Sequence, residues 1–129
     1  MFLFLFLADP QDMSEYVLYH NPRCSKSRSA LQLLEERGLS PTQILYLETP
    51  PTHDELQTVL TKLGMTARSL LRTGEPEYKS LDLANVNLSD DEIIDAMVRN
   101  PVLIERPILV VGDKAVIGRP TEKLLELLP

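Results

Sequence analysis

A strand–helix–strand pattern in the first third of the chain is the strongest constraint on its fold. Residues 15–19 (EYVLY) and 43–47 (QILYL) are short apolar strand candidates. Between them, residues 24–37 carry apolar side chains at helical spacing, and Gly38 supplies a stop signal. Strands joined by a crossover helix pair in parallel, with a right-handed connection. The pattern therefore predicts that the fold begins with a β-α-β unit.

The middle of the chain, residues 52–100, is predicted to be a helical insertion. Two capping boxes each precede apolar residues at helical spacing, and they are Thr52 with Glu55 and Ser89 with Glu92. A short helix is predicted between them at residues 66–72. Gly64 ends the first of the three helices, and Pro101 stops the last.

Strand signals resume after this insertion. Residues 108–111 (ILVV) and 114–117 (KAVI) flank the dipeptide Gly112-Asp113, which is a hairpin pattern. A terminal helix is predicted beyond residue 120 and carries Leu124, Leu125 and Leu128. The element order is then β-α-β, helical insertion, β-β-α. It predicts an α/β protein whose four-stranded sheet is mixed, since a hairpin joins a parallel pair.

The length of 129 residues fits a single domain, which we expect over residues 13–129. The preceding residues, 1–12, begin with the run MFLFLFL and are expected to be an N-terminal extension, with Met13 as an alternative start. This run is shorter than the ~20 apolar residues that span a bilayer and lacks the basic leading region of a signal peptide. A short membrane-attached or packed strand is the alternative interpretation.

The net charge and the cysteine content limit the classes of function that the chain can have. A formal net charge of −6 disfavours nucleic acid as a partner, because phosphates require a basic surface. A local arginine cluster remains compatible with a small anion. The single cysteine excludes an internal disulfide and suits a reducing compartment. We therefore expect a cytoplasmic protein without a membrane partner.

Cys24 is the principal candidate for chemistry. It lies at the predicted start of a helix, in the polar and cationic segment NPRCSKSR. Unpaired N–H groups and the helix dipole favour negative charge there, and nearby cations act in the same direction. Both effects favour the nucleophilic thiolate, and the N–H groups can also cradle an oxyanion. A buried cysteine acting as a small apolar side chain is the alternative, but it would be expected among apolar neighbours.

Four further side chains are candidates. His20 lies four residues before Cys24, at the end of the first strand, where it can help to ionise the thiol or order the turn. Arg72, Arg106 and Arg119 stand at the ends of predicted elements. Arginine suits tetrahedral oxyanions, because its planar fork donates hydrogen bonds in pairs and stays charged. No role is assigned to His53.

Several of these segments, in the same order, resemble one known family. The matching stretches are YHNPRCSKSR, ILYLETPPTHDEL, LLR at 70–72, MVRNPVLIERPILV and IGRPTE, and the resemblance covers essentially all of residues 16–129. The chain resembles the glutaredoxin-linked arsenate reductase family, the ArsC type, and within it the short YfgD-like members.

The resemblance implies a thioredoxin-like fold with a helical insertion. It implies that Cys24 is the nucleophile, that His20 assists the thiolate, and that Arg72, Arg106 and Arg119 bind the oxyanion. It also suggests a cis peptide bond between Arg106 and Pro107. One departure concerns the substrate, because Ser25 and Lys26 follow the cysteine where arsenate reductases carry a Gly-Thr pair.

The implied reaction is reduction of arsenate to arsenite through a Cys24 adduct, with glutathione and glutaredoxin resolving the adduct. No tightly bound cofactor or metal is expected, and glutathione is a co-substrate. The lone cysteine independently requires an external thiol.

Three alternative assignments bear on the same cysteine. Arsenate reductases with a C-x5-R loop are excluded, because the residue six after Cys24 is Ala30. A regulator of the Spx type that binds RNA polymerase carries a Cys-x-x-Cys switch, whereas Ser27 occupies the second position here. A glutathione-linked thiol oxidoreductase with another substrate is the third possibility, favoured by Ser25 and Lys26.

Overall fold

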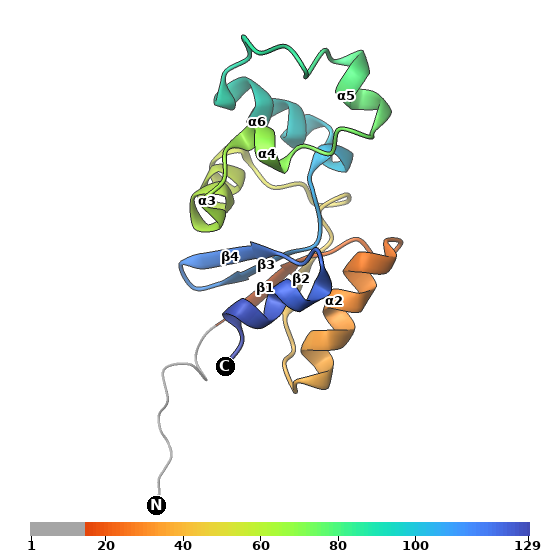
Figure 1. The fold of residues 1–129 in the computed structure, drawn as a ribbon, viewed down its shortest axis with the longest axis vertical. Helices are drawn as coiled ribbons and strands as arrows, with labels where there is room; N and C mark the ends of the chain where they lie inside the picture. The colour runs from red at the N-terminus through yellow and green to blue at the C-terminus, as the bar shows by residue number, and fades with distance from the viewer. Residues whose placement is uncertain (1–14) are drawn as a thin grey trace, which may run out of the picture.

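The computed structural model describes residues 15–129, so the predicted extension at 1–12 and its alternative lie outside the described residues. In the part that is described, no helix is both long and apolar enough to cross a bilayer. The described elements surround one sheet, and Figure 1 shows helices on both of its faces.

The sheet has four strands in the order β2-β1-β3-β4. They are β1 (Tyr16–Tyr19), β2 (Thr42–Ile44), β3 (Ile108–Val111) and β4 (Lys114–Ile117). β1 and β2 are parallel, whereas β1 with β3 and β3 with β4 are antiparallel. The turn of the hairpin uses Gly112 at φ 60°, a conformation that glycine adopts at little cost. The predicted mixed α/β sheet is confirmed.

Alternation along the strands gives each face of the sheet its own core. Because successive strand side chains point to opposite faces, Leu109 lies on one side and Ile108 with Val110 on the other. Leu109 pairs with Leu18 of β1 and packs under α2 (Ser25–Glu36) and the C-terminal helix η3 (Thr121–Leu127). The opposite face is covered by the helical segment, as Figure 1 shows.

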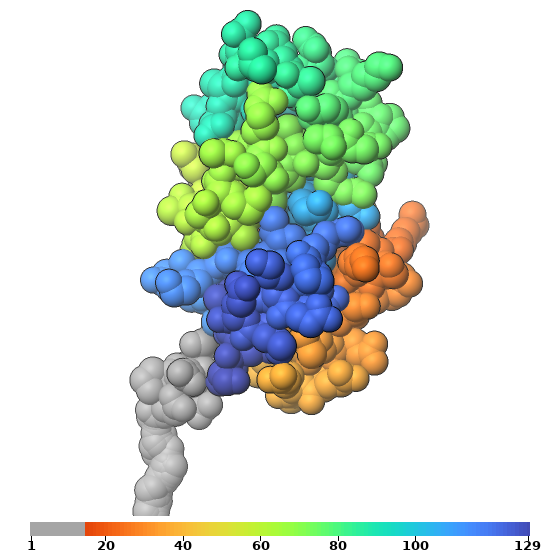
Figure 2. Space-filling model, viewed as in Figure 1, coloured from red at the N-terminus to blue at the C-terminus, as the bar shows by residue number. Residues whose placement is uncertain are grey.

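The residues between β2 and β3 are largely helical. They form α3 (His53–Leu63), α4 (Ala67–Leu70), α5 (Pro76–Ser80), α6 (Asp90–Arg99) and η2 (Pro101–Leu103). Both predicted capping boxes are present, at the starts of α3 and α6, and Gly64 ends α3 in the left-handed conformation. Figure 2 shows this segment, coloured from yellow-green to teal, as a continuous lobe above the sheet.

Two elements end earlier than the sequence predicts, and one α-helix was not predicted. β2 ends at Ile44, and residues 46–48 turn instead, because the N–H groups of Glu48 and Thr49 both donate to the carbonyl oxygen of Leu45. The helix predicted over 66–72 stops at Leu70, since Leu71 forms a bridge with Ile104. The short helix α5 had no predicted counterpart.

The C-terminal helix is also different from the one predicted. η3 is a 3₁₀ helix, in which side chains three residues apart lie over one another. Leu124 and Leu127 therefore both pack toward the core around Leu109, whereas Leu125 is 40% exposed. The predicted terminal helix is therefore present, and Leu125, one of the three leucines that the sequence placed on it, faces outward.

His53, to which the sequence assigned no role, joins α3 to α6. Its Nδ1 lies 2.8 Å from Asp95 Oδ1, and its Nε2 lies 3.2 Å from Asp91 Oδ1. The hydrogen bond to Asp95, and then the remaining contacts with the two carboxylates, raise the pKa of His53 above its usual value of 6.5. The protonated ring is therefore favoured in the folded state.

This arrangement predicts a pH-dependent effect of His53→Gln on stability. A histidine whose pKa is higher in the folded than in the unfolded protein stabilises the fold. This stabilisation is complete when the pH is below the pKa of the unfolded state, and it is lost as the pH rises through the pKa of the folded state. In urea denaturation, we expect the free energy of unfolding of wild type to exceed that of the variant most at about pH 5. This difference should shrink toward about pH 9. The exposed Arg37→Gln serves as control, and a gap independent of pH would contradict the assignment.

Candidate active site

Cys24 occupies the N-cap position of α2. The turn after β1 delivers it there, with the Cys24 N–H donating to Asn21 O at 3.0 Å. Its backbone is extended, at φ −95° and ψ 125°, and its side chain makes no capping hydrogen bond. The predicted position at a helix start is confirmed. The sulfur therefore lies beside N–H groups that have no partner within the helix.

Backbone and side-chain hydrogen bonds order the turn that carries Cys24. The His20 N–H donates to Ile44 O at 2.9 Å, which ties the turn to β2. The Asn21 N–H donates to the hydroxyl of Ser27 at 3.0 Å, and Arg28 Nη1 donates to Pro22 O at 3.0 Å. Ser27 is fully buried, so its hydroxyl is a fixed part of the turn and not a surface group.

His20 is buried next to this turn, with 4% of its surface exposed. Its Nδ1 is enclosed and has no hydrogen-bond partner among residues 15–129. Burial, and then the charge of Arg28, lower the pKa of His20 below its usual value. The neutral imidazole is therefore favoured. Within the described residues, no hydrogen bond joins this ring to the Cys24 sulfur.

Arg119 lies directly against the cysteine. Its Nη2 is 3.8 Å from Cys24 Sγ, and its Nε donates to the carbonyl oxygen of Arg106 at 2.8 Å. That second bond fixes the guanidinium with one end toward the sulfur. The Arg106–Pro107 peptide bond is cis, as the resemblance suggested, and the Arg119–Pro120 bond is also cis.

The three predicted arginines converge on one carboxylate, that of Glu105. Glu105 Oε1 lies 3.4 Å from Arg119 Nε, 3.8 Å from Arg72 Nε and 4.0 Å from Arg106 Nη1. The bridge between Leu71 and Ile104 brings Arg72 to this point, although it belongs to the helical segment. Arg72 is held further by Glu75, whose Oε2 lies 2.7 Å from Arg72 Nη1.

The Arg106 guanidinium has hydrogen-bond donors that lack an acceptor among the described residues. Its side chain is 12% exposed, and its Nε and Nη1 are buried without a hydrogen-bond acceptor among the described residues. Most buried donors in proteins have an acceptor, and an unpaired one costs stability. A positive group in this condition is suited to receive an anion.

Tyr46 belongs to the same neighbourhood. Its side chain is almost fully buried, and burial raises the pKa of its hydroxyl. The charges of Cys24 and Glu105 act in the same direction, whereas Arg72 and Arg119 act against it. The hydroxyl is therefore close enough for the charges of both the thiol and the arginines to affect its pKa. Sequence reasoning placed Tyr46 in a strand, and missed both it and Glu105 as site residues.

The comparisons with known proteins identify the family of the chain. The model of the ArsC family matches residues 19–127. The chain belongs to the ArsC family. It is 54% identical to YfgD of Escherichia coli K12 over 111 residues, which is 85% of this chain and 93% of YfgD. It is 47% identical over 113 residues to a protein of Neisseria meningitidis serogroup A named arsenate reductase, covering 87% and 97%.

Solved structures place this ArsC-family chain in the thioredoxin-like fold. A structure described as a putative arsenate reductase from Yersinia pestis superposes with a TM-score of 0.85 at 52% identity, covering 88% of this chain and all of that one. An arsenate reductase from Vibrio cholerae superposes with a TM-score of 0.86 at 48% identity, covering 88% and 98%. The predicted thioredoxin-like fold is confirmed.

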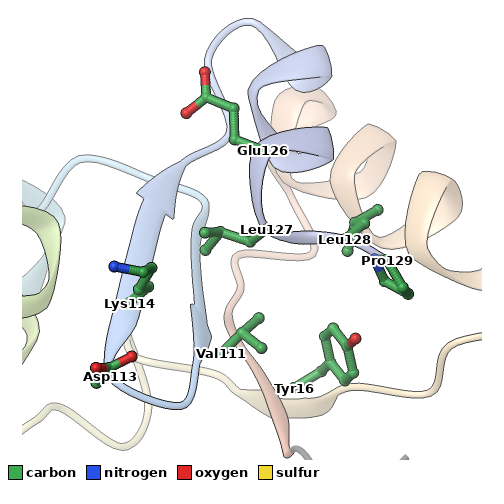
Figure 3. A pocket seen from close by; sticks show the side chains of 8 residues that line it. All are labelled: Tyr16, Val111, Asp113, Lys114, Glu126, Leu127, Leu128 and Pro129. Atoms are coloured by element: carbon green, nitrogen blue, oxygen red, sulfur yellow. The ribbon is translucent and has the colours of Figure 1, made fainter. Parts of the chain in front are cut away.

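A hollow of the ArsC-family chain, shown in Figure 3, holds none of these groups. It lies between the β3–β4 hairpin and the C-terminus, where Leu127, Leu128 and Pro129 face Tyr16 and Val111 across an open space. Among residues 15–129, no cysteine, histidine or arginine lines it. Within residues 15–129, no cluster of three or more His, Cys, Asp or Glu residues is arranged to hold a metal ion. The candidate catalytic and binding groups lie instead around Cys24, at the start of α2, and around Glu105.

Proposed function

We propose that this protein reduces arsenate to arsenite, with Cys24 as the nucleophile and Arg72, Arg106 and Arg119 as the oxyanion site. One observation carries the proposal: three arginines converge on Glu105, and one of them, Arg119, lies against the sulfur of a lone cysteine at a helix N-terminus. The relatives from Neisseria meningitidis and Vibrio cholerae that are named arsenate reductases support the same substrate.

Charge complementarity explains why arginines are needed. Arsenate is an anion at neutral pH, and an anionic thiolate cannot approach it closely unless positive groups offset the repulsion. Preorganised guanidinium groups provide this stabilisation without rearrangement. Arg119 is well placed for it, because one end of its fork faces Cys24 Sγ at 3.8 Å and the other is fixed by Arg106 O.

The proposed reaction begins at the sulfur. Cys24 Sγ attacks arsenic(V) and an oxygen leaves as water, which forms a sulfur–arsenic bond. The thiolate of glutathione then attacks Cys24 Sγ, the sulfur–arsenic bond breaks, and its electron pair stays on arsenic. Arsenite leaves with arsenic(III), and Cys24 is left in a mixed disulfide with glutathione. His20, held neutral by burial, is proposed to assist formation of the thiolate.

The second thiol must come from another molecule, because the chain holds a single cysteine. Glutaredoxin is the proposed partner that reduces the Cys24–glutathione disulfide by thiol–disulfide exchange. This cycle requires no tightly bound cofactor. It also requires a pool of reduced thiol, so we propose that the protein works in the cytoplasm.

Two alternatives lead to different experimental results. Ser25 and Lys26, next to the nucleophile, favour the hypothesis of a glutathione-linked oxidoreductase with a substrate other than arsenate. In a Spx-type regulator the position of Ser27 would carry a second thiol. Here that side chain is a buried hydroxyl bonded to the Asn21 N–H. A regulator would be inert toward arsenate and would bind RNA polymerase.

Arsenite release tests the proposal. Purified protein is supplied with arsenate, reduced glutathione and glutaredoxin, and turnover is followed both as arsenite formed and as NADPH oxidised by glutathione reductase. We expect turnover that depends on all three additions. Absence of turnover, with Cys24 readily glutathionylated, would instead support the oxidoreductase with another substrate.

A further inference from the structure

Glu105 places a negative charge in the middle of a site that is otherwise built to attract anions. Its Oε1 accepts the N–H of Arg106 at 3.0 Å and lies within 4.0 Å of a side-chain nitrogen of each of the three arginines. The side chain is 29% exposed, so it is partly open to solvent. An oxyanion bound by these arginines would therefore lie next to a fixed carboxylate.

The two oxygens of the Glu105 carboxylate differ in the contacts that they make. Every ion pair and hydrogen bond that the structure gives Glu105 through its side chain is made by Oε1. Within residues 15–129, Oε2 takes part in none of them. An ionised carboxylate only accepts hydrogen bonds, so Oε2 is an acceptor without a donor, beside guanidinium groups that are suited to bind an anion.

Tetrahedral oxyanions differ in whether they can supply that donor. Near neutral pH, arsenate and phosphate still carry at least one hydroxyl group, whereas sulfate carries none. A hydroxyl can donate to a carboxylate in a strong, charge-assisted hydrogen bond. The bare oxygens of sulfate meet only repulsion there, because both partners are acceptors. A carboxylate oxygen that a bound anion covers without offering a donor loses its water and gains no hydrogen bond, and this loss discriminates between otherwise similar ligands.

We propose that Glu105 sets the oxyanion selectivity of this site by accepting a hydrogen bond from a hydroxyl-bearing oxyanion, and that it thereby excludes sulfate. The proposal rests on the proposed function for the location of the anion. It adds that the site selects by protonation state as well as by charge and shape. Hydrogen arsenate and hydrogen phosphate are accepted, whereas sulfate is rejected despite its full negative charge.

Protection of the lone cysteine provides a readout that needs no turnover. Iodoacetamide labels Cys24 alone, because the chain has no other cysteine. An anion held at the arginines next to Sγ slows the labelling, so its dissociation constant follows from the rate at increasing sodium phosphate or sodium sulfate, at constant ionic strength and neutral pH. We expect phosphate to bind wild type about ten- to a hundredfold more tightly than sulfate.

Glu105→Gln removes the charge while keeping an oxygen for the Arg106 N–H, and its new amide hydrogens can donate to sulfate. We expect the phosphate-to-sulfate preference to fall to about one or to reverse. Glu75→Gln is the matched control, because it also removes a carboxylate paired with Arg72. It should tighten both anions by the same factor and leave the preference unchanged. Glu105→Asp, which keeps the charge, should keep the preference for phosphate.

The outcomes separate this inference from the proposed function. Equal binding of phosphate and sulfate by wild type, or binding of neither, overturns it. A phosphate-to-sulfate preference that is unchanged in Glu105→Gln also overturns it. So does a preference that falls equally in Glu75→Gln. If Glu105→Gln does not fold, as judged by circular dichroism, the wild-type and Glu105→Asp preferences still decide. Selectivity without arsenite release would contradict the proposed function alone, and release without selectivity would contradict this inference alone.

Discussion

Replacing Cys24 by serine is expected to abolish arsenate turnover. The hydroxyl is a much poorer nucleophile than a thiolate and cannot form the disulfide with glutathione on which the proposed second step depends. Loss of a catalytic nucleophile typically lowers turnover by about 10⁶-fold, which here means activity at background. The measurement is arsenite formed per enzyme under saturating glutathione and glutaredoxin, compared with a reaction without enzyme.

The structure offers a close control for this variant. Ser25 is the first residue of α2 and is exposed, so Ser25→Ala alters the same helix turn without removing the thiol. It should retain most of the activity. Cys24 makes no capping bond through its side chain, so Cys24→Ser should leave the thermal midpoint close to that of wild type. Arsenite release by the serine variant at more than about a tenth of the wild-type rate would show that another group performs the chemistry.

Local sequence patterns predicted the parts of the fold that depend on neighbouring residues. The capping boxes at Thr52 and Ser89 and the glycine turn of the hairpin each use chemistry contained within four residues. The end of α4 is different, because it is set by pairing of Leu71 with Ile104, which lies far away in the sequence. No window around Leu71 contains that information.

The candidate site also contains residues that local sequence patterns predict and residues that they do not. Cys24 could be placed at a helix start because a strand, a polar turn and an apolar helical stripe adjoin it in the sequence. Its contact with Arg119, ninety-five positions away, followed only from the family resemblance. Glu105 has no local signature that separates it from a surface glutamate, and its meaning emerges only when the fold surrounds it with three arginines. Proximity to Arg106 in the sequence was the one signal available.

Arg106→Ala is expected to weaken arsenate use strongly while leaving the fold intact. Removing one preorganised donor from an oxyanion site typically costs about 10²–10³-fold in rate, so kcat/KM for arsenate should fall by about that factor. Stability should not fall correspondingly, because the buried Nε and Nη1 of this side chain have no acceptor among the described residues and their loss removes an unfavourable burial. Steady-state kinetics and urea denaturation measure the two effects separately.

Arg37→Ala is the matched control, since it removes the same charge from an exposed position at the C-cap of α2. The hydrogen bond from Arg119 Nε to Arg106 O stays undisturbed in it. Its kcat/KM should stay within about twofold of wild type, because exposed charges are screened by solvent and salt. If Arg37→Ala and Arg106→Ala lowered kcat/KM equally, the effect would come from net charge. An unchanged KM and kcat in Arg106→Ala would remove this guanidinium from the oxyanion site and leave its unpaired, buried donors without a functional reason.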